Sequence, residues 1–230
     1  MNSKDLYSIY LERDELAEKL GGGIPKGSIV FIEGVEGSGR SVLCQRLGFG
    51  VLKNGHSLTY ISTEMTVKDF IDQMYSLDYL ITNHLSTGKL MFIPVYPIIG
   101  NPRPKGDFLH KLTTSHQLYR NDVIVIDSFS SLVDADDSTD LSAFMSFLKK
   151  MANQNKTIIL TAEKGKRGLD PLRLASDLYI DLNMKVGGDG IKRMIQVKRY
   201  IRARDRVDEM VGFRIEPGIG LVIEITEVSG

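Results

Sequence analysis

The chain has 230 residues, of which 42% are hydrophobic and 25% charged, and this length and balance indicate one soluble globular domain over residues 1–230. Its 29 Lys and Arg residues balance 29 Asp and Glu residues, so no overall field recruits nucleic acid or an anionic membrane. The single cysteine, Cys44, excludes an internal disulfide, and the N-terminus lacks the apolar core of a secretory signal, so we expect a cytoplasmic protein.

Strands and helices alternate along most of the chain. Short apolar runs rich in β-branched residues predict buried strands at residues 28–33, 58–62, 91–95, 123–127, 157–162 and 178–182. Apolar residues at helical spacing predict helices at residues 40–53, 67–74, 107–119 and 141–148. This alternation indicates an α/β fold with a mainly parallel central sheet flanked by helices.

The pattern changes after residue 182. The glycine-rich stretch 187–190 lies between two strand-like runs and predicts a hairpin, and further short strands are expected at 211–215 and 221–227. The fold class therefore includes an antiparallel, β-rich C-terminal edge.

The loop between the first predicted strand and helix has the spacing of a nucleotide phosphate loop. Residues 34–41, GVEGSGRS, match G-x-x-x-x-G-K-[ST] except at the lysine position, where Arg40 stands. Glycines let backbone N–H groups close around phosphate oxygens, and the following helix N-terminus adds positive potential. We therefore expect ATP to contact Gly34, Glu36, Gly37, Ser38, Gly39, Arg40, Ser41 and Val42. The alternative is a strand-to-helix turn without a ligand.

Arg40 keeps the positive charge of the missing lysine but not its shape. A planar guanidinium is wider than an ammonium and binds two oxygens edge-on. Binding needs attraction, whereas transition-state stabilisation needs exact placement of the charge. The substitution predicts nucleotide binding with slow or absent hydrolysis.

Two carboxylates follow predicted strands that neighbour this loop. Asp127 ends the strand VIVID and is expected to hold Mg²⁺ through water, with Ser41 as a direct ligand. Glu64 follows the strand LTYIS and is a candidate general base for the attacking water. The alternatives are a cap at Asp127 and a first-turn glutamate at Glu64 that favours the helix dipole. Thr161 either senses the γ-phosphate or satisfies a backbone group.

The remaining polar clusters are less specific. The basic residues Lys198, Arg199, Arg202, Arg204 and Arg206 predict a solvated face, a nucleic-acid patch, or cations that reach a neighbouring subunit's nucleotide. The acidic run 134–137 predicts a solvated loop, with a partner contact as the alternative. Cys44 is expected to be a small buried residue, and the four histidines show no metal-binding spacing.

Three stretches together resemble a known family. GGGIPKGSIVFIEGVEGSGRS, YISTEM and VIVIDSFSSL resemble the RecA/KaiC-like family of P-loop ATPases, and GGGIPKGS is characteristic of its KaiC-like branch. Within that branch, the single short domain looks most like the accessory ATP-binding proteins of the archaellum, the archaeal flagellum. The resemblance covers residues 5–228.

The resemblance implies a RecA-type fold, bound ATP and Mg²⁺, and a homo-oligomeric ring with nucleotide near the subunit boundaries. It also implies a cytoplasmic protein at the periphery of the cell membrane, whose partners are the motor ATPase FlaI, the ring scaffold FlaX and the membrane platform FlaJ; no DNA is expected. By position, residues 34–41 match the Walker A loop and Asp127 the Walker B aspartate. Glu64 matches the first of a pair of glutamates, and Met65 replaces the second.

Three hypotheses about function remain open. The first is an ATP-binding archaellum component whose bound nucleotide regulates assembly. The second is a catalytically active ATPase that acts on DNA or as a kinase, and the third is a scaffold with a vestigial loop. The changes at Arg40 and Met65, and the lack of a clean K-x-R match to the KaiC pattern in VKRYIR, favour weak catalysis.

Overall fold

The computed structural model describes residues 5–95, 106–133, 138–187 and 190–224. The predicted acidic loop at 134–137 and residues 225–227 of the last predicted strand lie outside this part of the chain.

In the described residues, nine strands form one sheet in the order β11-β10-β9-β8-β3-β7-β6-β4-β5. Its strands are β3 (Ile29–Gly34), β4 (Leu58–Ser62), β5 (Leu90–Pro94), β6 (Val123–Asp127), β7 (Thr157–Glu163), β8 (Leu178–Gly187), β9 (Gly190–Tyr200), β10 (Met210–Glu216) and β11 (Gly220–Glu224). The strands from β8 to β5 pair in parallel, and β9, β10 and β11 add antiparallel pairs. Both the mainly parallel sheet and the antiparallel C-terminal edge are confirmed.

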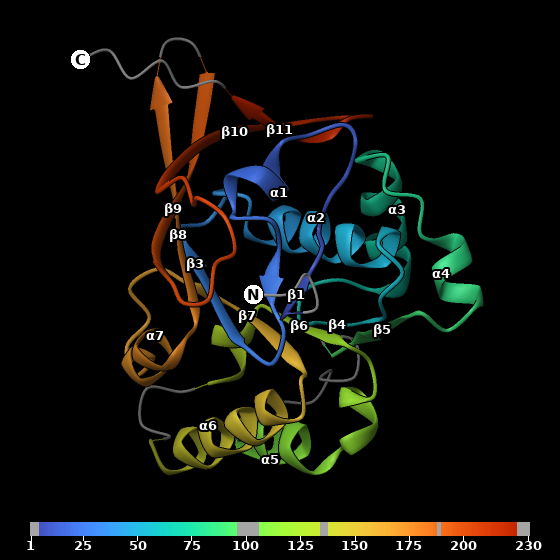
Figure 1. Ribbon diagram of the computed structural model, residues 1–230. Coiled ribbons are helices and arrows are strands. Elements are labelled where there is room, and N and C mark those ends of the chain that lie inside the picture. Colours follow the sequence, from blue (N-terminus) through green and yellow to red (C-terminus); the bar gives the residue numbers. More distant parts are fainter. Residues whose placement is uncertain (1–4, 96–105, 134–137, 188–189, 225–230) are drawn as a thin grey trace.

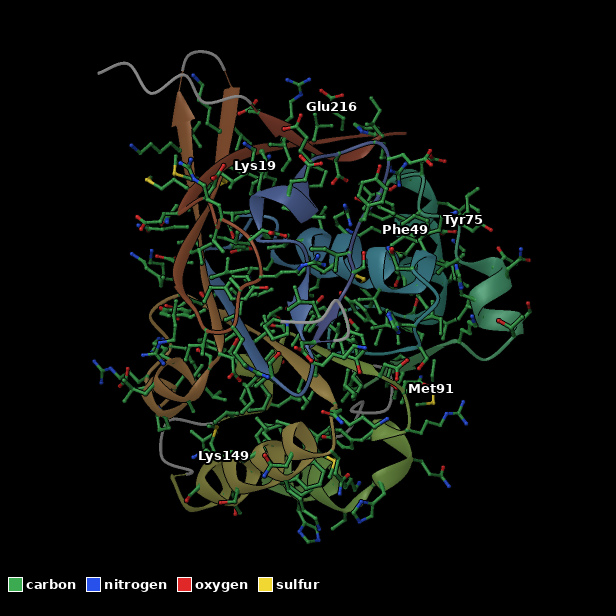
Figure 2. All side chains as sticks on the ribbon, in the orientation of Figure 1. Lys19, Phe49, Tyr75, Met91, Lys149 and Glu216 are labelled. Carbon is green, nitrogen blue, oxygen red and sulfur yellow. The ribbon has the colours of Figure 1, made fainter. Side chains whose placement is uncertain are left out.

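Helices cover both faces of the sheet (Figure 1). They are α2 (Arg40–Lys53), α3 (Val67–Ser76), α4 (Thr82–Ser86), α5 (Gly106–Thr114), α6 (Ser138–Asn153) and α7 (Asp170–Ala175), with 3₁₀ turns η3 (His116–Tyr119) and η4 (Phe129–Leu132). One apolar core lies between the sheet and α2 and α3, and the other lies between the sheet and α5, α6 and α7. Phe49 of α2, labelled in Figure 2, belongs to the first core and stacks on Tyr79 with ring centroids 5.0 Å apart.

The helix predicted at residues 107–119 is interrupted. Thr113 and Thr114 donate their hydroxyl hydrogens to the carbonyl of His110, at 2.8 and 2.9 Å, and α5 ends at Thr114. Hydroxyl side chains that bond the preceding turn compete with regular helix geometry, and the chain continues as the 3₁₀ turn η3.

Residues before β3 also form structure that the sequence did not predict. β1 (Leu6–Tyr7) pairs with β2 (Ile24–Pro25) in an antiparallel ribbon, and α1 (Leu16–Lys19) lies between them in the chain. Elements of two to four residues are too short for hydrophobic periodicity to reveal. No helix in the described part of the chain is long and apolar enough to cross a membrane.

The parallel strands bring the candidate residues to one edge of the sheet. Gly34 at the end of β3 is paired with Glu163 of β7, and Ser62 at the end of β4 is paired with Asp127 of β6. The carboxyl ends of these strands therefore meet beside the glycine-rich loop, where ligands bind in open α/β sheets.

Candidate nucleotide-binding site

The glycine-rich loop runs from the end of β3 at Gly34 to the start of α2 at Arg40. A Cβ atom on Gly34 would lie 2.5 Å from Ser38 Oγ and 2.8 Å from Leu182 Cβ, so only glycine fits where the loop packs against β8. Gly39, the N-cap of α2, has a φ of 93°, which L side chains rarely adopt. The sequence thus produces the compact loop that the spacing predicts.

Strands β8, β9 and β10 enclose the loop from the other side. A Cβ on Gly39 would lie 3.1 Å from Ile215 Cδ1 and 3.3 Å from Phe213 Cε2. Arg193 donates a hydrogen bond from Nε to the Gly37 carbonyl at 3.1 Å. These contacts come from residues far along the chain, and no local motif indicated them.

Several hydrogen-bond donors in the loop lack a partner. Ser38 Oγ and Arg40 Nη1 are buried and, among the described residues, have no hydrogen-bond partner. The N–H groups in the first turn of an α-helix also have no acceptor within the helix, which here concerns Arg40, Ser41 and Val42. Unpaired donors are costly to bury, and a polyphosphate supplies the acceptors that they need. The residues present therefore fit a nucleotide phosphate group.

Asp127 lies on the side of the sheet that faces α2. Side chains alternate along a strand, and Val123 and Val125 of β6 belong to the core on that side. The Asp127 carboxylate is 3% exposed and accepts hydrogen bonds from Tyr60 Oη and Thr161 Oγ1, each at 2.8 Å. Each carboxylate oxygen accepts one hydrogen bond, which leaves acceptor capacity for a water molecule on Mg²⁺, so the arrangement is compatible with the predicted magnesium role; the role itself stays a prediction.

Asp127 also affects the ionisation of its neighbours. Burial, with the negative charge of Asp127 second, raises the pKa of the Cys44 thiol well above its usual value, and Arg40 opposes the shift. The pKa of Tyr60 is likewise raised, mainly by burial and secondly by the negative charge of Asp127. Cys44 is buried in α2, as predicted, and the raised pKa keeps it a neutral thiol rather than a nucleophile.

Glu64 is exposed just beyond β4. The alternative, a first-turn glutamate that interacts favourably with the dipole of the next helix, does not hold, because α3 begins at Val67 after its N-cap Thr66 and the acid in its first turn is Asp69. Glu64 is close enough to the site for its negative charge to contribute to the raised pKa of Tyr60, although burial and Asp127 contribute more. Its role as a general base stays a prediction.

The other predicted residues occupy varied positions. Glu36 is exposed at the tip of the loop, and Ser41 is half-buried in the first turn of α2. Thr161 donates to the Asp127 carboxylate, so its hydroxyl serves a side chain rather than the backbone group considered from the sequence.

The basic stretch is partly used inside the chain. Arg202 donates to the carbonyls of Lys26 and Gly27 at 2.9 and 3.0 Å, and Arg199 donates to the carbonyl of Leu174. These bonds connect the end of β9 and the residues after it to α7 and to the loop before β3, a role that none of the three alternatives included. Lys198 and Arg204 are exposed.

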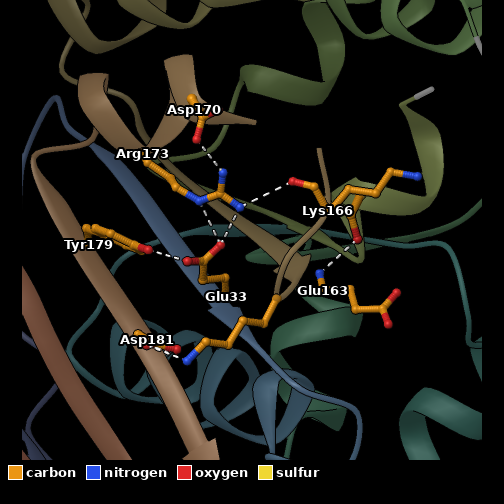
Figure 3. Close-up of polar contacts among 9 residues, drawn as sticks. Glu33, Glu163, Lys166, Asp170, Arg173, Tyr179 and Asp181 are labelled. Atoms are coloured by element: carbon orange, nitrogen blue, oxygen red, sulfur yellow. Dashed lines mark hydrogen bonds and ion pairs between the residues drawn. The ribbon is translucent and has the colours of Figure 1, made fainter. Parts of the chain in front are cut away.

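A buried ion pair just before the loop was not predicted (Figure 3). Glu33, 5% exposed in β3, accepts hydrogen bonds from Arg173 Nε and Nη2 at 2.9 and 2.8 Å, and Tyr179 Oη donates to its other oxygen. Arg173 also donates to the carbonyl of Lys166 at 3.3 Å. The only sequence signal was a glutamate in the otherwise apolar run SIVFIE, whose distant partner no local pattern reveals.

The comparison with protein families agrees with this geometry. A family model described as "ATPase: KaiC" matches residues 13–227. The chain belongs to the KaiC-like family of ATPases. The RecA/KaiC-like fold expected from the sequence is thereby confirmed.

Within the KaiC-like family, the chain is similar over its full length to proteins from methanogens. It is 38% identical over 234 residues to a protein of Methanocaldococcus jannaschii named archaeal flagellar ATP-binding protein FlaH, and the match covers 100% of both chains. It is 39% identical over 225 residues to the FlaH protein of Methanococcus voltae, with 96% of this chain and 98% of that protein covered.

Solved KaiC-like structures have the same fold. The crystal structure of the flagellar accessory protein FlaH from Methanocaldococcus jannaschii superimposes with a TM-score of 0.88 at 38% identity, covering 96% of this chain and 100% of that chain. The KaiC-like protein PH0186 from Pyrococcus horikoshii superimposes with a TM-score of 0.75 at 18% identity, again with 96% and 100% covered, which supports the fold alone.

Proposed function

We propose that this KaiC-like protein binds MgATP as a component of the archaellum motor complex, and that bound nucleotide regulates its assembly there. The observation that carries the proposal is the set of unpartnered buried donors at Ser38 and Arg40 in a glycine loop. The names of the FlaH relatives support the archaellum setting. By the same resemblance, the partners are FlaI, FlaX and FlaJ, and the protein works as a ring at the cytoplasmic side of the membrane.

The residues of the candidate site would divide the work of phosphate binding and metal binding. The loop and the start of α2 bind the phosphates, with Arg40 supplying a fixed positive charge. Ser41 and Asp127 would hold Mg²⁺, which would neutralise phosphate charge. Hydrolysis is weak or absent because the guanidinium of Arg40 replaces a more compact ammonium and Met65 replaces a second glutamate.

The test is a calorimetric titration with MgATP, coupled to an assay of phosphate release and to pull-down of the partner proteins. We expect saturable binding, little phosphate release, and partner binding that increases with nucleotide. In the Gly39→Val variant, a β-branched side chain would collide with Ile215 and Phe213 at a positive φ, so nucleotide binding and nucleotide-dependent partner binding should be lost together.

Gly88→Val is a matched control, because Gly88 also has a positive φ, of 71°, but no described atom lies within 4 Å of a Cβ there. No saturation by MgATP in the wild-type protein would instead support a scaffold with a vestigial loop. Unchanged partner affinity in Gly39→Val would exclude control by nucleotide.

A further inference from the structure

The β8–β9 hairpin contacts the phosphate loop directly. Met184 of β8 and Arg193 of β9 are paired in the antiparallel register. Arg193 Nε donates to the Gly37 carbonyl at 3.1 Å, and Met184 Sδ lies 3.7 Å from the position that a Cβ on Gly37 would occupy. The hairpin therefore holds the loop at Gly37, one of its exposed residues.

The Gly37–Ser38 peptide is bonded on both sides. Its carbonyl accepts the hydrogen bond from Arg193, and its N–H donates to the carbonyl of Val35 at 3.2 Å. Gly37 and Gly39 have φ values of 74° and 93°. Because glycine adopts positive and negative φ with similar ease, the backbone on either side of Ser38 has more conformations available than other residues would allow, and the hydrogen bonds of this peptide limit them.

We propose that Arg193 is a positioning residue for the nucleotide: by holding the Gly37–Ser38 peptide, it keeps the loop in its phosphate-binding form. The inference rests on the proposed nucleotide binding. A loop that is already in its binding conformation loses less conformational freedom when the phosphates arrive, so removal of the contact weakens affinity.

The coupling acts in both directions. If the Arg193 contact favours nucleotide binding, nucleotide binding favours the contact by the same factor. The hairpin should therefore be held more firmly in the presence of MgATP. Its outer end carries the cross-strand pair Val186 and Ile191, which are 75% and 47% exposed, so this effect reaches an apolar part of the molecular surface.

The test uses the full chain and three variants. Arg193→Met removes the donor and keeps much of the side-chain length, Arg193→Lys keeps a charged donor, and Arg214→Met removes an exposed arginine of β10 that pairs with Glu216. We expect MgATP to bind about tenfold more weakly to Arg193→Met, which corresponds to about 1.4 kcal/mol, the size of one hydrogen bond from a charged donor. Arg193→Lys should bind within about threefold of wild type, as expected when a charged donor is retained, and Arg214→Met should bind as wild type does.

The second measurement is hydrogen exchange of the amides at 184–187 and 190–194. MgATP should slow this exchange in the wild-type protein and not in Arg193→Met. A purely structural role would not make exchange depend on nucleotide.

The outcomes separate the two proposals. If the wild-type protein does not bind MgATP, the proposed function fails. If it binds and Arg193→Met binds equally well, the role of Arg193 fails while the proposed function stands. If Arg193→Met does not fold, as judged by circular dichroism, hydrogen exchange in the wild-type hairpin tests the proposal instead. Amide exchange that MgATP does not slow would overturn the proposed coupling.

Discussion

Arg40 is the residue on which the chemistry of this site depends most. One of its terminal nitrogens is buried without a partner among the described residues, so part of its hydrogen-bonding capacity is directed into the protein rather than to solvent. A guanidinium offers a fixed planar fork, whereas an ammonium offers a compact charge that rotates freely to meet phosphate oxygens. This difference concerns geometry and not net charge.

Replacing Arg40 by lysine should therefore raise hydrolysis more than affinity. We expect phosphate release to increase at least about tenfold, since one well-placed donor in a transition state is worth that much or more, while the Kd for MgATP changes by less than about threefold. Single-turnover phosphate release and calorimetry measure the two quantities. Equal or lower turnover in Arg40→Lys would show that Arg40 does not limit catalysis.

Glu64 is the residue whose removal tests the remaining catalytic capacity. A general base contributes about 10²–10⁴-fold, so the Glu64→Ala change in an Arg40→Lys background should abolish the added turnover and leave binding intact. Glu163→Ala is the control, because Glu163 is also an exposed acid at the carboxyl end of a strand in the sheet and has no role in the proposed site. Turnover that survives the loss of Glu64 would assign the base to another group.

At the scale of elements, α2 connects the candidate site to the N-terminal segment of the chain. Its first turn belongs to the candidate phosphate site, and near its middle Arg46 pairs with Asp14 in a salt bridge of 2.5 Å, with side chains 0% and 2% exposed. Arg46 Nη1 also donates to the carbonyl of Ile9 at 2.9 Å. The N-terminal segment is thus attached to the same helix that would hold the nucleotide.

Removing one partner of this buried pair should destabilise the fold strongly. Asp14→Ala leaves the Arg46 charge buried without compensation, so we expect the free energy of unfolding to fall by about 3–5 kcal/mol. Asp72→Ala is the comparison, because the Lys68–Asp72 pair on the surface of α3 is well exposed and should contribute little to stability. Urea unfolding of both variants measures the difference, and equal losses would contradict the assignment.

At the scale of the whole molecule, nucleotide bound at the proposed site would connect parts of the sheet that are distant in sequence. The loop follows β3, Asp127 ends β6, and the enclosing residues come from β8, β9 and β10. A ligand that contacts several elements at once opposes their separation, so nucleotide binding should stabilise the entire fold.

MgATP at one hundred times its Kd should add about 2.7 kcal/mol to the free energy of unfolding. At about 2–4 °C per kcal/mol for a chain of this size, the midpoint of thermal unfolding should rise by about 5–10 °C. Differential scanning calorimetry measures the shift. Gly39→Val should show none, and an equal shift in that variant would place the nucleotide elsewhere.

Local patterns in the sequence were sufficient for the elements with strong periodicity. The bounds of α2, β4 and β6 agree with those predicted, because each is a continuous apolar pattern with a clear end signal such as Asn54-Gly55. The short elements α4 and α7 were missed, since five or six residues do not establish a helical period.

By itself, the sequence determined the type of fold, the position of the glycine loop and the candidate residues Arg40, Glu64 and Asp127, because spacing and strand ends depend on neighbouring residues. Three sets of contacts were decided only by the tertiary structure. Tyr60 and Thr161 both donate hydrogen bonds to Asp127. Glu33 pairs with Arg173, and Arg193 holds Gly37. The last two contacts join residues 140 and 156 positions apart. Contacts over such distances are set by strand order and register, which local propensity does not encode.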